Sequence, residues 1–327
     1  MGIFLVKNAH SSAFFANFYF VSFVAFYHIN AIAGMQNNLS DQVVENKPAN
    51  KHKLKFLKNK KAERNSEDSE DKTDGSHFTK VTHRCKKEGE EGPDTSPQSP
   101  PLVIDDPGTP GCGQWEINVT FDIDSAKGEK HIEAPLLDIN YGIGDNLQLK
   151  FEVPNQLDQL EKGTESGLGN GKLGVKYLFY SNPKTNIEVA FYPQVEIPTS
   201  HSEPGHEINL PLLLTKKIGE TYLGDVIWAV NLGYNLTQNA DAKNFISVAS
   251  AIGAPLSKKL FIMGELASEQ ALGSLPNQER EALIVFNVGL KRSLGDKYSL
   301  YGSLGASLLA ADKNQHIYAV AGLQWTP

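Results

Sequence analysis

The sequence predicts an all-β protein, a twelve-stranded antiparallel transmembrane β-barrel of the outer-membrane type behind a signal peptide and a disordered linker. Segments between Trp115 and Trp325 alternate apolar and polar residues, their number is even, and the breaks between them are alternately short and long. In Trp115–Asp124 every odd position is a large apolar residue and every even position is polar or charged. A strand with this pattern has one apolar face and one polar face.

Composition sets the outer bounds of the prediction. The 327 residues have room for one large domain or two small ones. The formal net charge is −7 and basic residues do not cluster among the strands, so we expect no nucleic-acid partner. Mean hydropathy is slightly negative, which excludes a helical membrane bundle but not a barrel, because half of each barrel strand is polar.

Residues 1–33 have the parts of an export signal. A weakly basic start precedes the aromatic-rich run 14–27, and small residues at 31 and 33 mark a cleavage site. An uncleaved helical anchor is the alternative, but Asn17 and His28 interrupt the apolar run. We therefore predict a cleaved signal peptide.

Residues 34–101 show no periodicity and are predicted to form a disordered linker. A basic block at 51–61 is followed by an acidic block at 63–74 and a Pro/Ser/Gly-rich stretch at 92–101. Such a segment buries too little apolar surface to offset its ordering entropy. The basic block is interpreted as a solvated run of charge rather than a lipid or nucleic-acid site.

The only two cysteines, Cys85 and Cys112, precede the strands. Neither has the spacing of a metal ligand. They are either two separate thiols or one disulfide of an exported protein, and the sequence leaves both open.

Residues 102–327 are predicted to form the barrel. Most strands alternate well, whereas Gly, Ala and Ser weaken the pattern in the eighth, ninth and eleventh. The predicted strands are 113–124, 131–142, 147–154, 168–180, 186–198, 207–217, 223–236, 244–254, 259–269, 280–292, 298–309 and 315–325.

The connections indicate an orientation. Every second connection is a short turn rich in turn formers, and most of the others, including 155–167 and 199–206, are longer loops. The short turns are expected on the periplasmic side. Aromatic residues near the turn end predict an interfacial girdle. They are Trp115, Tyr141, Tyr177, Phe179, Tyr222, Phe261, Tyr298 and Trp325.

A soluble sandwich or a lipocalin-like barrel is the alternative fold, with its apolar face inward. Three features favour the membrane: no amphipathic helix is predicted to cover the sheet, strand lengths cluster near the ten or so residues that cross a bilayer when tilted, and charges such as Asp138 and Glu265 occur at mid-strand. Water or ion pairing in a lumen would satisfy those charges.

Charged residues on the polar faces are the candidate lumen-lining residues. Opposite charges occur at similar depth on adjacent strands, as with Asp138 beside Lys150. They form either a charged constriction that selects solutes or ion pairs that cross-link the wall of a nearly closed barrel. The candidates are Glu116, Asp122, Asp138, Lys150, Glu152, Lys172, Lys176, Glu188, Glu196 and Lys217.

No catalytic, cofactor-binding or metal site is predicted. The Ser/His cluster at 199–206 lies in a predicted loop, whereas a barrel hydrolase needs its nucleophile and base held on strands. The glycines of 167–171 precede a strand rather than a helix, so they do not form a phosphate-binding loop.

Several segments resemble the bacterial outer-membrane family named for the meta-pathway of phenol degradation. They are 101–107 ahead of Trp115-Glu116, 133–142, 147–154 and 167–177, and they cover the first four predicted strands. The resemblance implies a transporter-like barrel in the bacterial outer membrane that passes small, including aromatic or hydrophobic, molecules. It implies no site residues.

We therefore expect a porin-like channel whose partners are outer-membrane lipid and a small-molecule solute. A closed structural or partner-binding barrel is the first alternative, and an outer-membrane lipid hydrolase is the second. The sequence leaves the oligomeric state open.

Overall fold

The computed structural model describes residues 78, 96–160, 163–199, 206–238, 243–272, 282–310 and 314–327, all within one compact unit, His77–Pro327. The predicted signal peptide and most of the predicted linker lie outside these residues, as does Cys85. Cys112 is disulfide-bonded. In this part of the chain, no helix is long and apolar enough to cross a membrane.

The described chain is all strand and connection. The strands are β1 (Trp115–Ala126), β2 (Glu129–Gly144), β3 (Leu147–Leu160), β4 (Gly163–Leu168), β5 (Gly171–Asn182), β6 (Ile187–Phe191), β7 (Gln194–Ile197), β8 (Glu207–Thr221), β9 (Gly224–Thr237), β10 (Phe245–Ser257), β11 (Leu260–Ala271), β12 (Ala282–Ser293), β13 (Tyr298–Leu309) and β14 (Ile317–Trp325).

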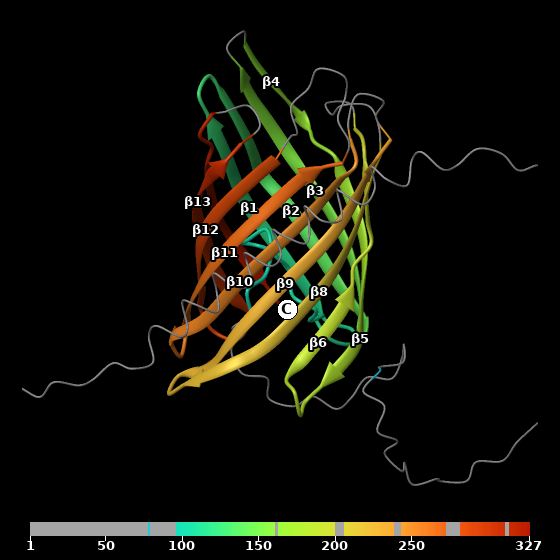
Figure 1. Cartoon of the computed structure of the whole chain (residues 1–327), viewed down its shortest axis with the longest axis vertical. Coiled ribbons are helices and arrows are strands. Elements are labelled where there is room, and N and C mark those ends of the chain that lie inside the picture. The colour runs from blue at the N-terminus through green and yellow to red at the C-terminus, as the bar shows by residue number, and fades with distance from the viewer. Residues whose placement is uncertain are drawn as a thin grey trace, which may run out of the picture. The chain divides into compact units, whose positions relative to one another are not determined.

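These strands close into one antiparallel barrel (Figure 1). β1 pairs with β14, and β3 pairs with both β4 and β5. β6 and β7 each pair with β5 on one side and with β8 on the other. β4 and β5 therefore share one position in the barrel wall, and β6 and β7 share another, so fourteen strands occupy twelve positions. The predicted twelve-stranded barrel is confirmed.

The prediction of a loop at 155–167 is wrong. β3 continues to Leu160 and pairs with β4 from Asn155↔Leu168 to Leu160↔Gly163, which makes a hairpin that rises above the loop end (Figure 1). A strand that extends beyond the bilayer needs no apolar face, so polar residues such as Asp158 and Glu165 can form it.

The predicted strand 186–198 is split at Tyr192-Pro193. Proline has no N–H to donate to a ladder. The carbonyl of Pro193 instead accepts from the Val175 N–H at 3.0 Å, and the Tyr192 N–H donates to the carbonyl of Pro211 at 3.0 Å. The wall therefore stays closed across the break.

Burial is the reverse of that in a soluble protein. Large apolar side chains face outward, with Phe121 52 % and Phe286 44 % exposed. Polar side chains face inward, with Asn118 and Glu265 fully buried and Asp138 3 % exposed. An apolar band around a closed barrel with a polar interior is the arrangement that a bilayer requires.

Aromatic side chains cluster at the turn end, as predicted. The rings of Trp115 and Tyr141 lie 4.5 Å apart and those of Tyr298 and Trp325 lie 6.4 Å apart, centroid to centroid. Phe261 is the exception, because it is 2 % exposed and belongs to the inner face. The girdle therefore lacks this predicted member.

The outward position of Phe286 gives a direct test of membrane embedding. Phe286→Arg is expected to destabilise the folded barrel in lipid by about 2–4 kcal/mol, because a cation then faces hydrocarbon. The measurement is reversible unfolding in lipid vesicles, with Phe286→Leu as the control. A soluble barrel would tolerate arginine at this exposed position, so an unchanged free energy of unfolding would contradict the embedding.

Candidate functional site

The interior of the barrel, here called the lumen, is lined by polar side chains from most of the strands. Those on β1 and β2 are linked directly: the Asn118 amide donates to Glu116 at 3.1 Å and to Asp138 at 3.2 Å. The Gln148 amide of β3 donates to Asn140 at 2.6 Å and to the Tyr192 hydroxyl at 3.3 Å.

Five of the candidate residues form one chain of ion pairs, the ion-pair ladder: Asp138, Lys150, Glu152, Lys172 and Glu196. Lys150 Nζ lies 3.6 Å from Asp138 and 2.6 Å from Glu152, while Lys172 Nζ lies 3.4 Å from Glu152 and 3.1 Å from Glu196. The strand register explains these contacts. Asp138 of β2 lies opposite Glu152 of β3, Glu152 lies opposite Lys172 of β5, and Lys172 lies opposite Glu196 of β7.

The other candidates lie elsewhere. Glu116 is linked to the ladder through Asn118, and Asp122 lies toward the loop end of β1, opposite Glu133. Glu188 accepts a hydrogen bond from Ser181 at 3.1 Å near the turn end. Lys217 pairs with Asp225 at 2.6 Å in the β8–β9 hairpin and is 30 % exposed.

Residues 98–114, here called the luminal segment, lie inside the barrel (Figure 1). Ser303 of β13 donates to the carbonyl of Pro101 at 2.7 Å. Lys176 of β5 donates to Asp105 at 3.0 Å. β13 and β5 are five positions apart in one direction around the barrel and seven in the other, so the segment joins nearly opposite walls of the lumen.

Glu265 of β11 holds this segment at its backbone. Its carboxylate accepts the Val103 N–H at 3.2 Å and the Ile104 N–H at 2.5 Å, and it also accepts the Asn287 amide at 2.7 Å. Hydrogen bonds to a charged group are stronger than neutral ones, and a buried carboxylate requires them.

An apolar patch on the inner face receives the segment. Leu102 and Ile104, 4 % and 0 % exposed, pack against it. We call this patch the alanine wall; it consists of Ala229, Ala249, Ala251, Met263 and Ala267 from β9, β10 and β11. Val103, between the two packed residues, is 63 % exposed. The segment therefore fills part of the lumen rather than all of it.

The end of the segment docks on β2 before β1 begins. The Gly113 N–H donates to the Gly142 carbonyl at 2.8 Å, and the Gly142 N–H donates to the Gln114 carbonyl at 3.0 Å. A Cβ at Gly142 would come within 1.7 Å of the Gly111 carbonyl oxygen. Only glycine therefore lets the segment approach this strand so closely.

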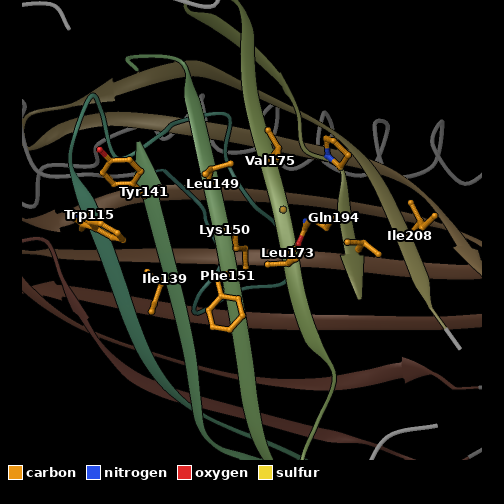
Figure 2. Close-up of a pocket in the computed structure, with 13 residues that line it drawn as sticks. Trp115, Ile139, Tyr141, Leu149, Lys150, Phe151, Leu173, Val175, Gln194 and Ile208 are labelled. Atoms are coloured by element: carbon orange, nitrogen blue, oxygen red, sulfur yellow. The ribbon is translucent and has the colours of Figure 1, made fainter. Parts of the chain in front are cut away.

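An apolar groove of about 650 Å³ lies on the outer surface. Trp115, Tyr141, Leu149 and Phe151 line one side of it (Figure 2). Leu173, Val175, Pro193, Val195 and Ile208 continue the lining. The groove follows β1, β2, β3, β5, β7 and β8 on the face that carries the apolar band. The groove is therefore separate from the lumen.

The described residues contain no group of three or more His, Cys, Asp or Glu arranged to hold a metal ion. His206 is described, but residues 200–205 of the Ser/His cluster lie outside the described residues.

Sequence reasoning missed the luminal segment, the role of Glu265 and the alanine wall. The available signals were the apolar triplet Leu102-Val103-Ile104 and the alanines of two weakly alternating strands.

No protein-family model matches the sequence, and no curated protein does. Solved structures do match. The COG4313 outer membrane channel from Pseudomonas putida F1 is similar over 69 % of this chain and all of that chain, at 13 % identity and a TM-score of 0.57. The NanC porin is similar over 64 % and 98 %, at 8 % identity and a TM-score of 0.50.

At these identities the likeness establishes the fold. It agrees with the twelve closed strand positions and with the apolar exterior. An α-helix or a closed barrel is the only way for a chain to cross a bilayer with its backbone hydrogen bonds satisfied. The chain forms a β-barrel of the bacterial outer membrane.

Proposed function

We propose that the protein is a channel that passes small solutes through its lumen. The observation that carries the proposal is the polar lining of a closed barrel, in which the ion-pair ladder runs across β2, β3, β5 and β7. Fixed charges of both signs in a narrow lumen favour small polar or charged solutes over large ones. The two porin-like structures described above support the same function by analogy of fold.

The luminal segment makes passage conditional on its position. Its described contacts with the wall are hydrogen bonds, one ion pair and apolar packing. Such contacts can break and reform, so a shift of the segment would widen the lumen. We therefore propose a channel that is narrow at rest.

A closed structural barrel is the second candidate. The contacts of Pro101 with β13 and of Asp105 with β5 favour it, because they join nearly opposite walls. The two candidates differ in one measurable property, which is conductance.

We further propose that the chain belongs to the family named for the meta-pathway of phenol degradation and acts as a transporter rather than as an enzyme. The segments 101–107 and 133–142 support this proposal. Outer-membrane lipid at the apolar band and a small solute in the lumen are the proposed partners.

The test is single-channel recording of the whole folded protein in a planar bilayer. A channel gives discrete current steps that depend on the salt concentration. Protein unfolded by heat before addition is the control for leakage. A silent trace from barrels that are folded, as judged by strand-type circular dichroism, would contradict the channel and support the closed structural barrel.

A further inference from the structure

We propose that the lumen contains a binding site for an amphipathic carboxylate, and that Leu102–Asp105 of the luminal segment occupy this site as an internal mimic of the ligand. The ligand class is an apolar chain or ring that carries one carboxylate. The inference rests on the proposed channel function and names the class of solute that this channel binds.

The alanine wall is the apolar half of the site. A barrel that conducts polar solutes is expected to have a polar inner face, yet β9, β10 and β11 present alanines and a methionine there. Leu102 and Ile104 cover this surface almost completely. When the segment leaves, the apolar area becomes exposed to water, and an apolar group of similar size gains free energy by covering it again.

Lys176 is the polar half of the site. The Lys176 side chain is 5 % exposed. Its ammonium group donates to Asp105 at 3.0 Å and lies 4.7 Å from the centre of the Tyr192 ring. A buried ammonium ion is costly without an anion beside it. When Asp105 departs, the carboxylate of a solute can take its place.

The spacing of the two halves defines the length of the ligand. The packed residues and the paired carboxylate lie within four consecutive residues, 102–105. Three residue steps span roughly 10 Å at full extension. A chain of six to eight carbon atoms with a terminal carboxylate is of this order, and so is a substituted aromatic acid.

Glu265 gives the site a direction. It lies beside the alanine wall, fully buried, where it now accepts the Val103 and Ile104 N–H groups. Without the segment, its negative charge repels a carboxylate from the apolar end. Lys176 attracts the same group at the opposite wall, so one orientation is favoured over the reverse.

The test is ligand binding by saturation-transfer NMR to the full chain in amphipol, with Glu265→Ala to weaken the hold on the segment. Hexanoate is expected to bind at least about tenfold more tightly than hexanamide, which has the same shape without the charge. Acetate, which lacks the apolar chain, is expected to bind more weakly than hexanoate. Lys176→Met in the same background should remove the preference, whereas Lys176→Arg and the matched control Lys217→Met should keep it.

Equal binding of hexanoate and hexanamide, or a preference that survives Lys176→Met, would overturn the inference. If Glu265→Ala fails to fold, Ile104→Ser is the second variant, because it weakens the packing of the same segment on the alanine wall. Conductance of the same samples separates the two proposals. A silent barrel that prefers hexanoate contradicts the channel and supports the site, and a conducting barrel without the preference contradicts the site alone.

Discussion

Glu265→Ala is expected to raise the single-channel conductance of the protein, because it releases the luminal segment from the wall of β11. The substitution removes the acceptor for the Val103 and Ile104 N–H groups. Hydrogen bonds to charged groups contribute about 1.5–3 kcal/mol each, so losing both shifts the docked segment toward the released state by about two orders of magnitude or more. The measurement is the distribution of conductance steps in planar bilayers.

Glu269→Ala is the matched control. Glu269 lies on the same strand, four residues toward the loop end, and faces the same way as Glu265. The control removes an equal charge from the lumen without removing the acceptor of the two amides. If both variants conduct alike, the change would be an effect of lumen charge and the anchoring role of Glu265 would be contradicted.

The barrel itself could be predicted from the sequence because the bilayer imposes a strict rule on its strands. Lipid on one side and water on the other force alternation with period two, as in Trp115–Asp124. The same rule explains the error at 155–167, because it does not apply beyond the bilayer. The Tyr192-Pro193 break was also missed, although the proline marks it.

The luminal segment could not be predicted in the same way. It is an irregular stretch without period, and what holds it is a set of contacts with strands far along the chain, such as Ile104 with Glu265 and Pro101 with Ser303. The alanines at 249 and 251 weakened the alternation of a predicted strand. The structure gives the reason for these small side chains, which is the space needed by Leu102 and Ile104.

The ladder residues were named from the sequence, but their mutual contacts depend on register. Asp138, Glu152, Lys172 and Glu196 align only because β2, β3, β5 and β7 pair as they do. A shift of one residue would turn these side chains toward lipid. Lys217, named with the same reasoning, lies in a hairpin outside the ladder.

Lys150→Met is expected to destabilise the folded barrel by about 3–5 kcal/mol, since removing one member of a buried ion pair leaves the opposite charge without compensation. Lys150 is the cation between Asp138 and Glu152, and its side chain is 10 % exposed. Methionine keeps most of the side-chain volume and removes only the charge. The measurement is the free energy of unfolding in urea, from folded and unfolded bands that differ in gel mobility.

Lys217→Met provides the matched comparison, because Lys217 pairs with the more exposed Asp225, and such a surface pair contributes about 0–1 kcal/mol. Adding Asp138→Asn to Lys150→Met should recover part of the lost stability, since the carboxylate left unpaired is then neutral. In the wild-type background Asp138→Asn should instead destabilise the barrel. If Lys150→Met costs no more than Lys217→Met, and Asp138→Asn acts alike in both backgrounds, the ladder is a row of independent solvated charges. Its residues would then be available to a passing solute rather than committed to holding the wall.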